Sequence, residues 1–270
     1  MREIVIPKHL KDYLEVEDCS NFNMKNYFVS QQMNEIKNDI IRTREKSAII
    51  QEILGTFYPN TTLLYGPPGT GKTSFAKYLA HEFDTDFVYI NFSKIFNGIF
   101  GKTTGIISDI FDFMTDKECI FVLDEIDCIS QKRGTEADVT GGEISRVTVT
   151  LMQSMDKLRQ NKSKVILIGC TNRIDIMDAA LKSRFSISKE LRGLNNQEKQ
   201  TYIEMFLDDI NKKLLKAGMN SLNYKTANIM EYCSRGVTIT QRNVEMDLIR
   251  CIAEWLDDTT QPFELNHIKE

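Results

Sequence analysis

Several features that would place this chain in a membrane, exported or zinc-binding class of protein are missing from its sequence. No segment approaches about 18 uninterrupted apolar residues, so no transmembrane helix is expected. The first residues, 1–7, are too short and too soon polar to form a signal peptide. The six cysteines form no C-x-x-C pair and the three histidines are scattered, which argues against a zinc site. We therefore expect buried free thiols and a cytoplasmic protein.

The chain also lacks a surplus of basic residues. It has 34 lysines and arginines against 38 aspartates and glutamates, a net charge of −4. Overall charge therefore gives no sign of nucleic acid or an anionic membrane as partner, although folding could still gather a local basic patch. The 270 residues, 41% hydrophobic and 27% charged, suit a globular protein with a large domain and a smaller one.

The most informative feature that is present is a complete phosphate-binding loop over residues 66–73, G-P-P-G-T-G-K-T. The apolar run Thr61–Tyr65 precedes it, and Ser74–Ala80 follows with helical spacing, which is the context that this motif requires. Glycines let successive backbone N–H groups turn toward one anion, and the helix points the positive end of its dipole at the same place. An ordinary glycine-rich turn is the alternative, but it would match this full pattern only rarely.

The loop predicts ATP and Mg²⁺ as cofactors. Lys72 is expected to reach the β- and γ-phosphates, and the Thr73 hydroxyl to bind Mg²⁺. The other expected nucleotide-binding residues of this segment are Pro68, Gly69, Thr70, Gly71 and Ser74. No Asn/Thr-Lys-x-Asp motif of the guanine-reading type is present, which mildly favours adenine.

Strands and helices alternate after Thr61, which predicts an α/β fold with a parallel sheet covered by helices on both faces. The expected strands are 87–90, 119–123 and 164–169, and the expected helices are 106–113 and 143–158. Three helical segments follow, starting near residues 195, 224 and 240, and Glu198 is placed for a capping box if Asn195 caps the first. We expect a short N-terminal segment at 1–55 that carries a helix and no separate domain, an α/β nucleotide-binding part at 56–191 and a small helical part at 192–270.

Polar residues follow the expected strands where ligands gather in such sheets. Asp124 is placed to hold Mg²⁺ directly or through water, and Glu125 to orient and deprotonate the attacking water. Asn172 could bond that water or the γ-phosphate, although an asparagine after a strand is more often a turn residue or a helix cap. Arg184, near the end of a short helix, could project toward a neighbouring subunit or simply be solvated.

The order of these motifs resembles the AAA+ ATPases, and within them the classical AAA group, over about residues 25–256. The phosphate loop is similar at every position to that family's form. Segment 123–127, L-D-E-I-D, followed by Q-K-R-G at 131–134, resembles its second motif, and 171–185 resembles its second region of homology. The resemblance implies a P-loop NTPase sheet followed by a helical lid.

The resemblance also implies roles for single residues. Lys72 and Thr73 would bind phosphate and Mg²⁺, Asp124 would support Mg²⁺ and Glu125 would activate water. Asn172 would sense the γ-phosphate, and Arg184 would act as an arginine finger in the next subunit. Arg242 resembles a second sensor, with a surface arginine in the first turn of a helix as the alternative.

The segment Ile99, Phe100 and Gly101 aligns with the family's substrate-gripping pore loop. Its aromatic residue stands one place late, and Phe100 could instead pack as core. The finger region has a single arginine where many members have two. A second glycine-bearing segment, 133–142, could form another pore loop or a connector.

Three functions compete at this stage. The first is an ATP-driven ring, hexameric in the family, that remodels, unfolds or disassembles a protein substrate, directly or through an adaptor. The second is a nucleic-acid-associated AAA+ ATPase of the clamp-loader or helicase-loader type, whose binding would fall steeply with salt. The third is a scaffold that binds ATP without much turnover, which the presence of both Glu125 and Arg184 argues against.

Overall fold

The computed structural model describes residues 4–22, 27–55, 57, 59–96, 102–129, 139–234 and 240–266. In this part of the chain two compact units can be distinguished. The first contains most of the chain up to Leu191. The second contains Arg192 and the residues after it, together with two shorter segments, one ending at Gln31 and the other Pro67–Gly71.

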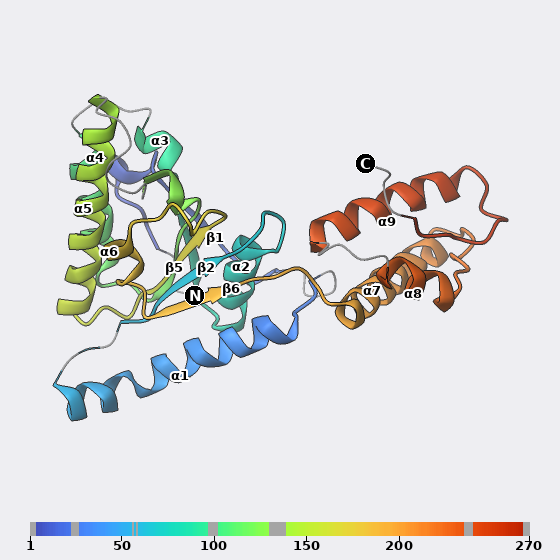
Figure 1. Ribbon diagram of the computed structural model, residues 1–270, viewed down its shortest axis with the longest axis horizontal. Helices are drawn as coiled ribbons and strands as arrows, with labels where there is room; N and C mark the ends of the chain where they lie inside the picture. The colour runs from blue at the N-terminus through green and yellow to red at the C-terminus, as the bar shows by residue number, and fades with distance from the viewer. Residues whose placement is uncertain are drawn as a thin grey trace. The chain divides into compact units, whose positions relative to one another are not determined.

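A sheet of six strands runs through the described residues of the first unit (Figure 1), in the order β1-β3-β4-β5-β2-β6. The strands are β1 Leu14–Glu17, β2 Thr61–Tyr65, β3 Asp86–Ile90, β4 Cys119–Leu123, β5 Ile166–Thr171 and β6 Ile187–Glu190. The edge strand β1 pairs with β3 in the antiparallel direction, and the other four described pairings are parallel. The predicted parallel sheet is therefore confirmed.

The helices of this unit come between the strands along the chain. They are α1 Gln31–Leu54, α2 Lys72–Glu82, α3 Phe92–Phe96, α4 Thr103–Met114, α5 Val139–Gln160 and α6 Ala179–Lys182, with short 3-10 turns at Lys8–Leu10 and Ile126–Ile129. The helix expected in the N-terminal segment is present as α1. The helices expected at 106–113 and 143–158 are present as α4 and α5, with ends that differ from the prediction by one to four residues.

Helices cover both faces of the central strands, which explains why β4 is apolar throughout. Phe121 and Leu123 face the layer formed by α4 and α5, where the rings of Phe111 and Phe121 meet edge to face with centroids 5.4 Å apart. Ile120 and Val122 are equally buried but point the other way. There α2 packs against β3, β4 and β5. A strand buried on both faces is what a parallel sheet requires.

Two details of the sheet differ from the sequence prediction. Strand β5 begins and ends two residues later than expected, so that it includes Cys170 and Thr171. Strand β6 was not predicted, because its four residues, Ile187–Glu190, are only partly buried and too few to establish an alternating pattern. It joins the sheet by pairing with β2.

The second unit contains the helices α7 Asn196–Lys216, α8 Thr226–Ser234 and α9 Gln241–Leu256. The predicted capping box is confirmed, because Asn195 accepts from the Glu198 N–H while the Glu198 carboxylate accepts from the Asn195 N–H. Gly218, with φ at +70°, follows the last turn of α7 in the left-handed conformation that glycine adopts at no steric cost. Tyr202 and Trp255 belong to the apolar core that these helices share.

Among the described residues, none of the helices combines the length and the apolar composition that crossing a bilayer requires.

Candidate active site

Three neighbouring parallel strands end at one edge of the sheet, and each is followed by residues that the sequence analysis singled out. Strand β5 lies between β4 and β2. Asp124 follows β4, Asn172 follows β5 and Gly66 follows β2. Because carboxyl ends of parallel strands meet at the same edge, the sheet brings these segments together although they are far apart in the sequence.

The phosphate loop begins at a glycine that no other residue could replace. Gly66 has φ at +141°, and a Cβ built there would lie 2.2 Å from the carbonyl oxygen of Leu191. Leu191 is held in that place because its N–H donates to the carbonyl of Tyr65 at 2.7 Å. Gly69 and Gly71 also have positive φ, +81° and +87°. The first turn of the loop is therefore set by close backbone approach as well as by glycine's conformational freedom.

Gly66→Ala is expected to abolish detectable nucleotide binding. The added methyl group would clash with the Leu191 backbone and force Gly66 out of its positive φ, so the loop would lose its shape. Fluorescent nucleotide titration and thermal unfolding of the variant would measure this. Gly105→Ala is the matched control, because nothing lies within 4 Å of a Cβ added there. Normal nucleotide affinity in Gly66→Ala would contradict the expectation.

Lys72 and Thr73, at the start of α2, make contacts that suit phosphate and Mg²⁺. Lys72 is buried, and its Nζ donates to the carbonyl of Gly66 at 2.8 Å, so the ammonium is held at the root of the loop. The Thr73 Oγ1 donates to Asp124 Oδ2 at 2.6 Å. A hydroxyl and a carboxylate oxygen this close are the hard ligands that Mg²⁺ prefers, and a divalent ion would fit with the hydroxyl proton turned away.

Glu125 has an unusual backbone conformation for a glutamate. Its φ is +50°, in the left-handed region that residues other than glycine seldom occupy, and its side chain is exposed. The Glu125 N–H donates to Asp124 Oδ1 at 2.9 Å, so the Asp124 carboxylate is bonded to the backbone of Glu125. Such a conformation costs on the order of 1–3 kcal/mol of folding free energy, and strained residues of this kind cluster at functional sites. Here it turns the chain between β4 and the following 3-10 turn.

Asn172 is exposed just after β5, and the preceding residue, Thr171, is buried. The Thr171 Oγ1 donates to Asp127 Oδ1 at 2.7 Å and accepts from the Arg173 N–H at 2.9 Å. Asp127 stands two residues after Glu125. This contact therefore joins the end of β5 to the turn that follows β4. Thr171 and Asp127 lie within the two motif segments of the sequence, but neither residue type signals such a pairing on its own.

Arg184 lies away from the phosphate loop of its own chain. Its carbonyl accepts from Thr61 Oγ1 at 2.9 Å, and Thr61 is the first residue of β2, whereas the loop follows the last. The strand between them spans about 13 Å at 3.3 Å per residue. The guanidinium donates to the carbonyl of Ala180 at 3.0 Å and to Asp156 Oδ2 at 3.3 Å, with about a third of the side chain, 32%, exposed. Arg184 is thus poorly placed to serve its own site.

The last group of predicted residues is only partly described. Arg242 is the second residue of α9, with an exposed side chain, and its N–H donates to the carbonyl of Gly69 at 3.4 Å. Both residues belong to the second unit. Ile99, Phe100 and Gly101 lie outside the described residues, as does most of the second glycine-bearing segment.

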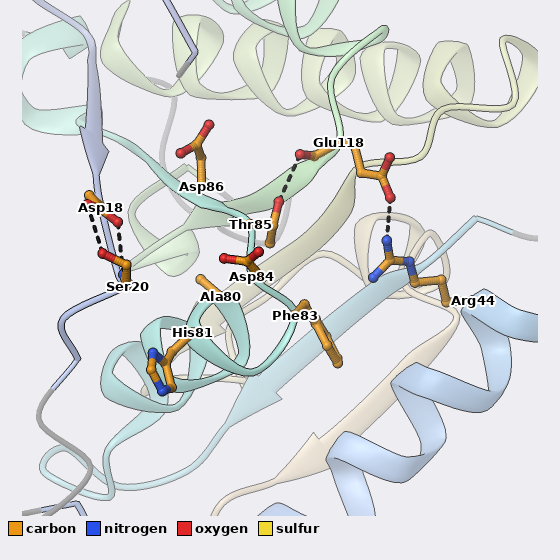
Figure 2. Close-up of a pocket in the computed structure, with 10 residues that line it drawn as sticks. All are labelled: Asp18, Ser20, Arg44, Ala80, His81, Phe83, Asp84, Thr85, Asp86 and Glu118. Atoms are coloured by element: carbon orange, nitrogen blue, oxygen red, sulfur yellow. Dashed lines mark hydrogen bonds and ion pairs between the residues drawn. The ribbon is translucent and has the colours of Figure 1, made fainter. Parts of the chain in front are cut away.

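A separate cavity of about 330 Å³ lies near the amino ends of β3 and β4 (Figure 2). Four carboxylates line it, from Asp18, Asp84, Asp86 and Glu118. The one guanidinium shown there, that of Arg44, is paired with Glu118. Because an acidic lining repels phosphate, this cavity does not suit a nucleotide, and the carboxyl edge of the strands stays the candidate site.

Comparison with known proteins supports this reading of the site. Residues 62–192 match the ATPase family associated with various cellular activities (AAA). A proteasome-activating nucleotidase of Methanococcus maripaludis is 35% identical over 185 residues, which cover 66% of this chain and 44% of that protein. The 26S proteasome regulatory subunit 8 of Dictyostelium discoideum is 36% identical over 170 residues, which cover 62% of this chain and 41% of that protein.

A more distant relative is the peroxisomal ATPase PEX6 of Candida glabrata, 31% identical over 176 residues, which cover 63% of this chain and 17% of that protein. The chain spans less than half the length of the first of these relatives, 44%. The family match, residues 62–192, includes the phosphate loop and Asp124. Residues 62–192, with their phosphate loop and strand-end carboxylates, therefore form a domain of the AAA family of ATPases.

Proposed function

We propose that this chain is the ATP-hydrolysing subunit of a ring that remodels, unfolds or disassembles a protein substrate, with each active site shared between two subunits. The observation that carries the proposal is the separation of Arg184 from the phosphate loop of its own chain. Gly66 at the start of the loop, Asp124 and Asn172 lie at the carboxyl edge of the sheet, whereas Arg184 is attached at the other end of β2. A finger arginine in that place completes a site only in another copy.

In this proposal the residues at the carboxyl edge divide the work. Lys72 would exchange its bond to the Gly66 carbonyl for phosphate oxygens, and Thr73 and Asp124 would hold Mg²⁺. Mg²⁺, when bound, would neutralise charge on the transferring phosphoryl group. Glu125 orients the attacking water and takes up its proton, and Asn172 fixes the water or the γ-phosphate.

The proposal also gives roles to Arg242 in the second unit and to the predicted pore loop, Ile99, Phe100 and Gly101. Arg242 would act as a second sensor, which is supported by its backbone contact with Gly69. Ile99, Phe100 and Gly101 would grip a polypeptide, but they lie outside the described residues and the role stays a prediction. A helical lid at 192–270 and the ring of six subunits are proposals of the same kind.

A protein substrate or adaptor is favoured over nucleic acid. The names of the relatives, a proteasome-activating nucleotidase and a 26S proteasome regulatory subunit, connect those proteins with a protein machine. The net charge of −4 offers no general attraction to nucleic acid. We propose a cytoplasmic location as well, because all six cysteines are free. Five are buried as expected, and Cys128 is exposed, contrary to the expectation. Burial raises the pKa of Cys119 to about 12, which suits a thiol that stays reduced and unreactive.

The rate of ATP hydrolysis per subunit is expected to rise as the protein assembles, and to rise again with an unfolded polypeptide. ATPase assays over a range of protein concentrations, with light scattering for mass, would measure both effects. Single-stranded DNA in place of the polypeptide is the matched addition. Stimulation by DNA alone would support the loader function instead. A rate that does not depend on assembly would contradict the shared site.

A further inference from the structure

We infer that Thr61 is a positioning residue for Arg184, and that it fixes the finger of each subunit to the strand that leads into the phosphate loop of the same subunit. The inference rests on the proposed role of Arg184 and concerns a residue that no motif identifies. It follows from a partly buried hydrogen-bond cluster, here called the β2 clamp and formed by Thr61, Arg184 and Ser186.

The hydroxyl of Thr61 is the centre of the β2 clamp. Its Oγ1 donates to the carbonyl of Arg184 at 2.9 Å and accepts from the N–H of Ser186 at 2.9 Å. Thr61 is buried, with 2% of its surface exposed, so its hydroxyl depends on these two bonds and not on water. One side chain therefore holds the backbone on both sides of Phe185.

The hydroxyl of Ser186 closes the clamp from the other direction. It lies 2.8 Å from the carbonyl of Thr61 and 3.0 Å from that of Pro59, and it can donate to either. It also accepts from the N–H of Thr61 at 3.2 Å. Immediately after it, β6 begins its parallel pairing with β2, and the two strands run side by side in Figure 1.

Phe185 provides a second anchor for the same segment. Its ring lies directly on β5, because a Cβ built on Gly169 would be 2.7 Å from the Phe185 Cζ. Arg184 is therefore flanked by a buried ring on β5 and a hydroxyl clamp on β2. Its side chain, by contrast, is only partly buried and makes exchangeable contacts with Ala180 and Asp156.

These contacts anchor the backbone of Arg184, here called the base of the finger, and leave its guanidinium partly exposed. The backbone of Arg184 is attached to β2, whose other end becomes Gly66 of the phosphate loop. A small displacement of that base would move the guanidinium relative to the neighbouring subunit's phosphates, and such misplacement lowers rates steeply. Removal of the Thr61 hydroxyl should therefore damage the site of the next subunit and leave the subunit's own nucleotide binding intact.

The test uses rings mixed from two kinds of subunit. Arg184→Ala subunits keep Glu125 but supply no finger, and Glu125→Gln subunits supply a finger but do not hydrolyse ATP. Activity in the mixture comes only from Arg184→Ala sites that border a Glu125→Gln neighbour. Thr61→Val is then added to the Glu125→Gln donor, so that it can affect only the finger that this donor supplies.

We expect the Thr61→Val donor to restore about tenfold less activity than the Glu125→Gln donor alone, with unchanged nucleotide affinity and assembly. Thr61→Ser in the donor should restore full activity, because it keeps the hydroxyl. Ser186→Ala should lower the recovery in the same direction. Thr62→Val is the matched control, because Thr62 is also buried, with 0% exposed, and its Oγ1 has no hydrogen-bond partner among the described residues.

The possible outcomes separate this inference from the proposed function. No recovery with the Glu125→Gln donor itself would count against the shared site, and with it against the basis of this inference. Recovery that Thr61→Val does not change would overturn the role of Thr61 while leaving the shared site in place. Loss of the donor's own nucleotide affinity or assembly would also overturn it, because the effect would then lie in the fold and not in the finger.

Discussion

Glu125→Gln is expected to bind ATP normally and to hydrolyse it about a thousandfold more slowly. The amide keeps the size and the left-handed backbone of Glu125 but cannot take a proton from water. Since the binding residues are elsewhere, the loss should appear in kcat and not in nucleotide affinity, and it corresponds to about 4 kcal/mol of lost transition-state stabilisation. Steady-state hydrolysis and fluorescent nucleotide titration would measure the two quantities.

Glu118→Gln is the matched control for this substitution. Glu118 stands just before β4, whereas Glu125 stands just after it, so the same change is made at opposite ends of one strand. The control loses only a surface ion pair with Arg44, which is worth about 0–1 kcal/mol of stability. Turnover within a few fold of normal in Glu125→Gln would remove Glu125 from the role of base.

Arg184→Ala is expected to lower the ATPase rate of the assembled protein about a thousandfold, the scale of an arginine finger's contribution. The low rate of dilute, unassembled protein should hardly change, because Arg184 does not serve its own site in the proposed function. Measurement of the rate against protein concentration for both proteins would therefore show the wild-type curve rising and the variant curve staying flat.

Two further variants sharpen this expectation. Arg184→Lys keeps the charge but loses the planar fork, and should recover only part of the rate. Arg42→Ala removes an exposed arginine of α1 that is paired with Asp39 at 3.6 Å, and should leave the rate unchanged. An Arg184→Ala protein whose rate still rises with assembly would show that the neighbouring subunit contributes something other than this side chain.

The sequence predicted the local elements of the fold well. The central strand at Cys119–Leu123 and the capping box at Asn195 were found where expected, because each depends on residues that are neighbours in the chain. The phosphate loop was recognised for the same reason, since its glycines, lysine and threonine form one continuous pattern. The strand and loop context also indicated the family, which the comparisons confirmed.

The residues that support the site could not be predicted in the same way. Thr61 and Arg184 are separated by 123 residues in the sequence, and Thr171 and Asp127 by 44. Threonine and serine are common in strands and turns, and nothing in their spacing indicates which carbonyl or carboxylate they will meet. The short strand β6, which brings Ser186 to Thr61, was itself not predicted.

By itself the sequence determined the chemistry available to this protein: a phosphate loop, two carboxylates after an apolar strand, and an asparagine and an arginine farther along. The tertiary structure alone decided which of these residues are neighbours. The order β4-β5-β2 brings Gly66, Asp124 and Asn172 to one edge, and the β2 clamp holds Arg184 at the other. The physical reason is that local patterns depend on nearest-neighbour geometry, whereas strand order and buried hydrogen bonds depend on how the whole core packs.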